Sequence, residues 1–217
     1  MLPLSSSYRP LALSTNAEPT MTCRIRLVTF DAYLTLFKPT GSVSLQYAEE
    51  AVKHGVQVTK AAISQNFGVE FNNQLQRYPL YGHQVGKTTR TWWEELIYAT
   101  YIGAGVSKQV LDPVYDKVFD ALFIRFATAE GYTVFPEVRE TLIQLRQKGY
   151  KMGVLSNSDE TVVSVLEGLG LAQYFDFILP SCMVGYDKPD KRMYEKALQE
   201  AGVRPEEALH VGDDLET

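Results

Sequence analysis

Hydrophobic and polar positions along this chain follow two different periods, and the change from one to the other divides it into parts. Residues 25–30 are a short apolar run rich in β-branched residues, which predicts a buried strand. Three similar runs lie at 150–156, 175–180 and 208–212, and apolar residues three or four apart predict helices over 135–149, 159–170 and 190–202. Strands that alternate with helices of this length predict a parallel sheet with right-handed crossovers.

The segment between the first strand and the rest carries helical spacing and no clear strand. Apolar side chains recur four residues apart in the sets Val43, Tyr47, Ala51; Ile63, Phe67, Phe71; and Trp93, Ile97, Tyr101, and the period continues over 110–126. We therefore expect an α/β fold with a Rossmann-like core of residues 23–40 and 128–217, and an all-helical cap domain inserted over 41–127. Residues 1–22 are rich in Ser, Thr and Pro, which is typical of a disordered leader.

Polar residues follow each of the four predicted strands. They are Asp31 after the first, Ser156 and Asn157 after the second, Lys188 in the loop after the third, and Asp213 and Asp214 after the fourth. Any one of them alone is an ordinary turn or helix-capping residue. Because ligands of an open parallel sheet bind beyond the carboxyl ends of its strands, four such endings of compatible chemistry predict a reactive site.

These side chains suit phosphoryl transfer through a covalent aspartyl phosphate. Asp31 would attack phosphorus, Lys188 would neutralise negative charge, and the Ser156 hydroxyl would hold phosphate oxygens. A dianionic phosphate is repelled by two carboxylates, so we expect Mg²⁺ to bridge Asp31, Asp213 and a phosphate oxygen. The predicted partner is thus a small molecule, a phosphate ester.

The stretches LVTFDAYLTL, GVLSN, GYDKPD and ALHVGDD resemble, in order, spacing and hydrophobic context, the four motifs of the haloacid dehalogenase superfamily of hydrolases. The resemblance covers residues 24–217, and the helical insert lies where that family carries its first-type cap. It implies that Asp31 is the nucleophile and that Tyr33 offers its backbone carbonyl to the magnesium ion. It also implies that Thr35 supports the phosphate-binding loop.

The same resemblance assigns the remaining residues of the site. Ser156 binds the transferred group with Asn157 beside it, Lys188 pairs with Asp31 and the phosphate, and Asp213 is the acidic magnesium ligand. In the family another acid follows four or five residues after this ligand, where this chain has only its final residue, Thr217. Asp214 or Glu216 is the nearest substitute, so we expect a weakened metal site and a truncated C-terminal edge of the sheet.

Tyr33 departs from the pattern of the family's phosphatases, which carry a second aspartate two residues after the nucleophile. That aspartate protonates the leaving group and later activates water. A tyrosine with a pKa of about 10 is a poor general base at neutral pH. Since general acid–base catalysis contributes roughly 10²–10⁴-fold to a rate, Tyr33 predicts slow phosphatase turnover.

Tyrosine at this position resembles the 2-haloacid dehalogenases, in which the aspartate displaces halide from carbon and no metal is needed. Against this alternative, residues 55–70 lack the arginine that binds halide, Arg77 and Arg90 fall late in the insert, and Gly212-Asp213 is intact. We therefore expect magnesium-dependent hydrolysis. A metal-free dehalogenase-type hydrolase and a non-catalytic relative that acts as a binding protein remain the alternatives.

Composition narrows the partners further. The chain has 217 residues, is 45% hydrophobic and carries a net charge of −5 with no basic block, which argues against nucleic acid or an anionic membrane as partner. No apolar run approaches the ~20 residues that span a bilayer. We expect a cytoplasmic or nuclear protein, and Arg9, the single early base, gives slight support to a mitochondrial transit peptide.

Cysteine and histidine usage predicts no further site. Cys23 and Cys182 have no pair spacing, which argues against a disulfide framework and a thiolate metal site, and His54, His83 and His210 are isolated, as surface or packed histidines are. The cap aromatics, Tyr78, Tyr81, Trp92, Trp93, Tyr98 and Tyr101, are interpreted as helix packing rather than a substrate cage. Neither substrate identity nor oligomeric state follows from the sequence.

Overall fold

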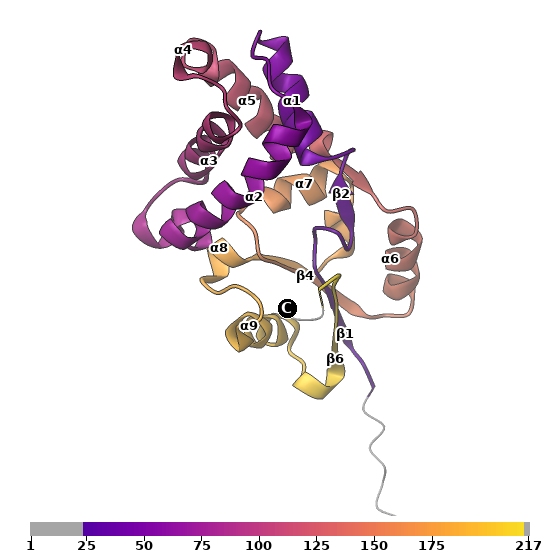
Figure 1. Cartoon of the computed structure of the whole chain (residues 1–217). Helices are drawn as coiled ribbons and strands as arrows, with labels where there is room; N and C mark the ends of the chain where they lie inside the picture. The colour runs from indigo at the N-terminus through magenta and orange to yellow at the C-terminus, as the bar shows by residue number, and fades with distance from the viewer. Residues whose placement is uncertain (1–23, 215–217) are drawn as a thin grey trace, which may run out of the picture.

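A computed structural model describes residues 24–214 of the chain, so the predicted leader over 1–22 lies outside the described residues. Figure 1 shows two groups of elements: helices α1–α5 gather at one end, and the main sheet with its flanking helices lies at the other. No helix within residues 24–214 is both long and apolar enough to cross a bilayer.

The main sheet has four parallel strands in the order β5 (Phe177–Pro180), β4 (Lys151–Ser156), β1 (Leu27–Phe30) and β6 (Ala208–Val211). All residues of β1 are buried, which explains why its sequence is apolar apart from Thr29. Because the four strands run in the same direction, their carboxyl ends meet at one edge. This confirms the predicted parallel α/β fold. Within the described residues, β6 pairs only with β1.

Helices cover both faces of this sheet. The helices α6 (Val138–Gln147) and α7 (Thr161–Gly168) pack Leu142 and Leu166 onto Val28 and Phe30 of β1. On the other face, α9 (Lys191–Ala201) packs Met193 against Leu155 of β4. The predicted helices over 135–149, 159–170 and 190–202 are therefore confirmed, with ends a few residues shorter than the apolar pattern indicates. The short helix α8 (Ser181–Val184) follows β5 and was not predicted.

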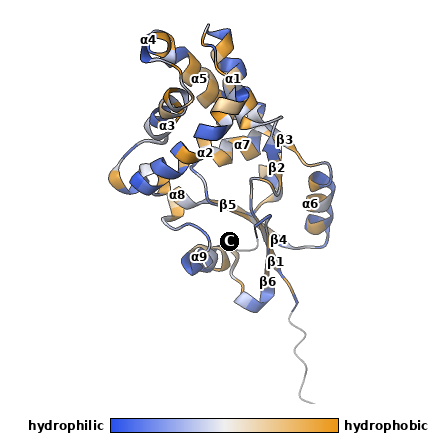
Figure 2. Cartoon of the chain, viewed as in Figure 1, coloured by the Kyte–Doolittle hydropathy of each residue, from blue (hydrophilic) through white to orange (hydrophobic). Residues whose placement is uncertain are grey.

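A second group of helices forms between β1 and β4. It contains α1 (Val43–Lys53), α2 (Lys60–Arg77), the 3₁₀ segment η1 (Leu80–Val85), α3 (Thr89–Gly103), α4 (Lys108–Leu111) and α5 (Tyr115–Phe126). Hydroxyls of Ser42, Thr59 and Thr88 accept backbone N–H groups at the first turns of α1, α2 and α3. These helices share a core of their own, and in Figure 2 hydrophobic and hydrophilic residues alternate along them, as expected for helices that bury one face.

Two short strands join the beginning and the end of this helical segment. β2 (Phe37–Pro39) pairs antiparallel with β3 (Tyr132–Val134), and the 3₁₀ turn η2 (Ala129–Gly131) precedes β3. This pairing was not predicted, because each strand has three residues and a proline ends one of them. The 3₁₀ turns η3 (Ala172–Tyr174) and η4 (Pro205–Glu207) precede β5 and β6. The arrangement is consistent with a helical insertion over 41–127.

Candidate active site

Asp31 stands at the carboxyl end of the central strand β1 and is paired with a buried cation. Its backbone N–H donates to the Val211 carbonyl over 2.8 Å, which ties the ends of β1 and β6 together. The Lys188 Nζ lies 3.0 Å from Asp31 Oδ1, and the Lys188 residue is only 4% exposed. The Ala32 N–H donates to the same oxygen over 2.7 Å. Within the described residues Oδ2 has no protein partner, so it is available to attack a substrate or bind a cation.

Burial raises the pKa of Asp31 above its ordinary value, and the nearby Asp213 carboxylate acts in the same direction. The Lys188 ammonium and the Ala32 N–H oppose this shift by stabilising the ionised form. Asp31 is therefore a partly desolvated carboxyl group whose ionised form is favoured by Lys188. A carboxylate with little hydration and a positioned counter-charge is suited to act as a nucleophile.

The loop after Asp31 turns sharply and leaves two polar atoms unpaired. Leu34 adopts a left-handed conformation with φ of 61°, its N–H donates to the Phe37 carbonyl, and the Leu36 N–H donates to the Ala32 carbonyl. Within residues 24–214 no hydrogen bond uses the Tyr33 carbonyl oxygen. The buried Thr35 Oγ1 also has no partner there. Buried polar atoms are normally satisfied, so the Thr35 hydroxyl and the Tyr33 carbonyl are candidate contacts for a ligand of this loop.

The second strand end brings Ser156 and Asn157 to the same edge. The Ser156 Oγ is buried and has no partner among the described residues, as expected of a hydroxyl that awaits a ligand oxygen. Asn157 makes two hydrogen bonds to the Lys188 backbone: its amide nitrogen donates to the carbonyl over 2.8 Å, and its amide oxygen accepts from the N–H over 2.7 Å. Its side chain thus positions Lys188, and this use was not part of the sequence prediction.

The fourth strand end carries the predicted acidic metal ligands. Gly212 lies beside Asp31, since a Cβ built on it would stand in ordinary contact with the Asp31 Cβ at 3.7 Å, and Asp213 follows directly. Asp213 and Asp214 are both exposed. Asp31, the Tyr33 carbonyl and Asp213 together form an all-oxygen donor set at this edge, which is the kind of set that Mg²⁺ prefers. The residues present therefore fit a magnesium ion.

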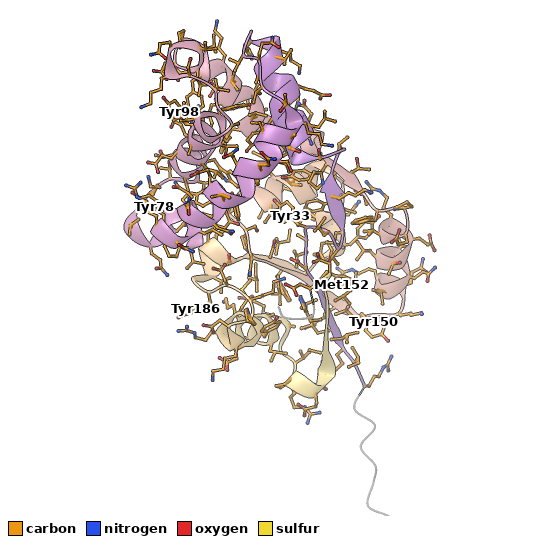
Figure 3. The ribbon with its side chains drawn as sticks, viewed as in Figure 1. Tyr33, Tyr78, Tyr98, Tyr150, Met152 and Tyr186 are labelled. Atoms are coloured by element: carbon orange, nitrogen blue, oxygen red, sulfur yellow. The ribbon has the colours of Figure 1, made fainter. Side chains whose placement is uncertain are left out.

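The Tyr33 side chain faces the helical segment. Its ring packs edge-on against Phe37 and Tyr132, with ring centroids 4.9 and 5.7 Å apart. Burial raises the pKa of Tyr33 well above its ordinary value, with nearby Tyr132 and Asp159 adding to the shift. Figure 3 shows Tyr33 between the sheet and the cap helices. Tyr33 is therefore a neutral phenol that contributes surface to a pocket and cannot accept a proton as a base.

A cavity of about 290 Å³ lies between the sheet edge and the helical segment. Aromatic rings dominate its walls: Tyr33, Tyr47, Phe67, Phe71, Tyr81, Trp93, Phe123, Phe126 and Tyr132. Asn157 and Ser158, which follow β4 at the carboxyl edge of the sheet, also line it. The interpretation of the cap aromatics as packing holds for the fully buried Trp92 and Tyr101. Tyr81 and Trp93, however, face the cavity, whereas Tyr78 and Tyr98 lie away from Tyr33 in Figure 3.

The cavity wall also holds Asp159, a residue that the sequence indicated only as part of a helix cap. Its two oxygens accept hydrogen bonds from the Trp93 Nε1 over 2.6 Å and the Thr161 N–H over 2.8 Å. Burial raises its pKa despite these bonds.

His210 was likewise missed: its Nδ1 lies 2.9 Å from the Thr29 hydroxyl, and burial lowers its pKa to about 4, so the ring is neutral.

Comparison with known proteins identifies the family. The family model described as haloacid dehalogenase-like hydrolase matches residues 25–216. The chain is 38% identical to haloacid dehalogenase-like hydrolase domain-containing protein 3 of Mus musculus, over 88% of this chain and 74% of the relative.

Two solved structures are similar in fold. One is a defluorinating L-2-haloacid dehalogenase (TM-score 0.67, 19% identity, 87% of this chain and 73% of that one). The other is a haloacid dehalogenase-type phosphatase from Thermococcus onnurineus (TM-score 0.55, 22% identity, 89% of this chain and 79% of that one). Both share the architecture of this chain. One is named a dehalogenase and the other a phosphatase, so the fold alone does not specify the reaction.

Proposed function

This chain belongs to the haloacid dehalogenase-like hydrolase family, and from that premise we propose that it hydrolyses phosphate monoesters with Mg²⁺ through a covalent intermediate on Asp31. One observation carries the proposal. The buried Lys188 ammonium lies 3.0 Å from Asp31 at the edge where the Ser156 hydroxyl is buried without a partner among the described residues. A cation and an unused donor beside a carboxylate suit a phosphate group.

The first step forms a bond between Asp31 and phosphorus. The Asp31 carboxylate oxygen attacks, the bond from phosphorus to the ester oxygen breaks, and the alcohol leaves with a proton taken from water. Lys188 and Ser156 hold the phosphate oxygens during the transfer. In the second step water attacks phosphorus, which releases inorganic phosphate and restores the Asp31 carboxylate.

Magnesium would be held by Asp31, the Tyr33 carbonyl and Asp213, and Asp214 is a further candidate. When bound, Mg²⁺ supplies positive charge that lets an anionic phosphate approach carboxylates. Asn157 contributes indirectly, because its hydrogen bonds fix the backbone of Lys188. Thr35 contributes a buried hydroxyl, unpartnered within residues 24–214, to the loop that follows the proposed nucleophile.

Tyr33 makes both steps of the proposed reaction slow. Since its pKa is raised, it neither protonates the leaving alcohol well nor activates water for the second step. Esters with good leaving groups are therefore the better substrates. The aspartyl phosphate should accumulate, because its hydrolysis lacks a general base.

The cavity indicates the chemical class of the ester. Its walls are aromatic and aliphatic apart from Asn157, Ser158, Asp159 and Thr161. Those hydroxyl groups of a sugar or nucleotide that face the rings would be left unpaired, at a cost of about 1–3 kcal/mol each. The alcohol part of the substrate is thus an apolar group, alkyl or aromatic, of a size that fits about 290 Å³.

Tyr33 and the apolar cavity also favour a second candidate, hydrolysis of a 2-haloacid without metal. The position of the arginines counts against it. No arginine of residues 24–214 lines the cavity. Arg90 pairs with Asp120 and stacks over Phe119, and Arg77 stacks over Tyr78. A carboxylate and a departing halide would find no cation on the cap side of the pocket.

Phosphate release from a panel of phosphomonoesters, with and without Mg²⁺, tests the proposal. We expect release that requires both Mg²⁺ and Asp31, with aryl and alkyl esters preferred over sugar phosphates. The matched control is Asp31→Asn, which keeps the shape of the side chain and removes the nucleophile. Halide release from 2-haloacids in chelator, with no phosphate release from any ester, would favour the second candidate.

A further inference from the structure

A second cluster of ligand-type side chains lies on the contact between the helical segment and the core, apart from Asp31 and Asp213. His83, Glu160 and Cys182 place a ring nitrogen, a carboxylate oxygen and a thiol sulfur within 4.8 Å of one another. His83 belongs to η1, Glu160 directly precedes α7, and Cys182 belongs to α8. Segments far apart in the sequence meet here, so ligand spacing along the chain could not reveal the cluster.

The separations suit a small cation with tetrahedral preference. The His83 Nε2 lies 3.1 Å and the Cys182 Sγ 3.7 Å from the Glu160 Oε2. Ligands at zinc distances of about 2.0–2.3 Å stand roughly 3.3–3.8 Å apart around a tetrahedron. The 3.7 Å separation falls within this range, the 3.1 Å separation lies just below it, and the remaining pair of atoms is no more than 4.8 Å apart, so the three atoms are spaced as ligands of one small ion are. The partly exposed His83 and Glu160 leave a fourth position open to water.

Charge and donor type select the cation. A thiolate, an imidazole and one carboxylate form a borderline-soft set that suits Zn²⁺ and is unsuitable for Mg²⁺, which requires oxygen ligands. The ionised Glu160 and Cys182 side chains would together balance a charge of +2. Cys182 is buried, so a neutral cluster avoids the cost of an uncompensated charge there. We propose that His83, Glu160 and Cys182 bind Zn²⁺ and that this ion fastens the helical segment to the core.

The backbone of the segment just before His83 is constrained. Leu80 and Tyr81 have φ of 50° and 57°, and Gly82 follows with φ of 79°. A Cβ at Gly82 would lie 2.7 Å from the Lys87 Cβ, so only glycine fits. The Tyr81 hydroxyl donates to the Asn157 carbonyl over 3.0 Å.

Zinc at this cluster would therefore influence the position of Asn157 and Lys188 through a short chain of contacts. Tyr81 lies two residues before His83 and contacts the backbone of Asn157, and the Asn157 side chain holds Lys188. An ion that fastens η1 to the core thus fixes Tyr81, which lines the cavity together with Asn157. We expect Zn²⁺ to stabilise the folded chain and to slow exchange of ligands with the cavity.

The test is stoichiometric zinc binding by the metal-free full chain, measured against a competing fluorescent chelator. One equivalent should bind, and X-ray absorption should show one sulfur at about 2.3 Å with nitrogen and oxygen at about 2.0–2.2 Å. Mutation of a residue that only hydrogen-bonds to a metal ligand typically weakens metal binding 10–100-fold. Cys182→Ser and His83→Gln remove a ligand itself, so each should weaken zinc binding by more than that. Thermal stability should rise with zinc concentration in the parent chain and not in these variants.

Two matched controls separate this site from adventitious binding. Cys23→Ser removes the chain's other thiol, and His54→Gln removes a histidine that lies beside a carboxylate, Glu50, without a thiol. Both should keep the full equivalent. Asp31→Asn should also keep it, so failure of the phosphatase proposal would leave this result untouched. If Cys182→Ser does not fold, Glu160→Gln, at a partly exposed position, replaces it. Unchanged affinity in the ligand variants, or no sulfur at the zinc, would overturn the proposal.

Discussion

Replacing Tyr33 with aspartate should create the acid–base group that the site lacks. The new carboxyl would lie two residues after Asp31 beside an apolar cavity, where burial raises a carboxyl pKa and so favours a general acid. General acid–base catalysis contributes roughly 10²–10⁴-fold, which corresponds to about 2.7–5.4 kcal/mol of barrier at about 1.36 kcal/mol per tenfold.

The same change has a structural cost. Tyr33 packs against Phe37 and Tyr132, and removal of a buried aromatic ring destabilises a protein by about 3–5 kcal/mol. The cost here should lie below that range, because Tyr33 is only half-buried. Since typical domains are stable by about 5–15 kcal/mol, the variant should fold, and circular dichroism with urea unfolding checks this.

The assay compares an ester with a good leaving group against one with a poor leaving group. A general acid helps an alkyl alcohol to depart much more than a nitrophenol, so Tyr33→Asp should raise kcat/KM more for an alkyl phosphate than for p-nitrophenyl phosphate. Tyr33→Phe, which removes only a hydroxyl with a raised pKa, should leave both rates nearly unchanged. Equal gains on both esters, or no gain in a folded variant, would refute the reasoning.

Three further predictions follow from the packing and charges. Lys188→Gln should lower kcat/KM by roughly 10²–10³-fold, as loss of one transition-state donor does, and should move the acid limb of the pH–rate profile upward, because Lys188 lowers the pKa of Asp31. Burial raises the folded-state pKa of Asp159, so its contribution to stability falls as pH rises from about 3.9 through that raised value. Urea unfolding across this interval should therefore show Asp159→Asn improving relative to the parent chain as pH rises. Leu166→Ala should cost about 2–5 kcal/mol in urea unfolding, whereas Val110→Ala, at a residue 49% exposed, should stay within about 0.5 kcal/mol.

The candidate site at the carboxyl edge of the sheet could be placed from the sequence because its position depends on local signals. Each strand is an apolar run, and parallel strands bring their carboxyl ends together, so Asp31, Ser156 and Asp213 meet without knowledge of any long-range contact. The hydrogen bonds from Asn157 to Lys188 could not be predicted in the same way. They depend on how two loops pack in space, and no periodic pattern encodes that.

The cavity and the second cluster depend entirely on contacts between distant segments. The spacing of Trp93, Ile97 and Tyr101 indicates one buried face of α3, but Trp92 and Leu96 are buried as well, on the side that faces η1 and α8. A helix covered on two sides shows no single apolar stripe. Isolated histidines and an unpaired cysteine likewise carry no spacing signal, so His83, Glu160 and Cys182 became neighbours only in the structure.

The most direct test of the central claim is rapid acid quenching of the reaction with p-nitrophenyl phosphate and Mg²⁺, followed by mass spectrometry of the peptide that contains Asp31. Because Tyr33 supplies no general base for the second step, the account predicts a burst of p-nitrophenol and a phosphoryl group on Asp31 that accumulates toward one per chain. Both should disappear in chelator and in Asp31→Asn. Steady phosphate release from Asp31→Asn, or turnover of the parent chain with no adduct on Asp31, would contradict the account.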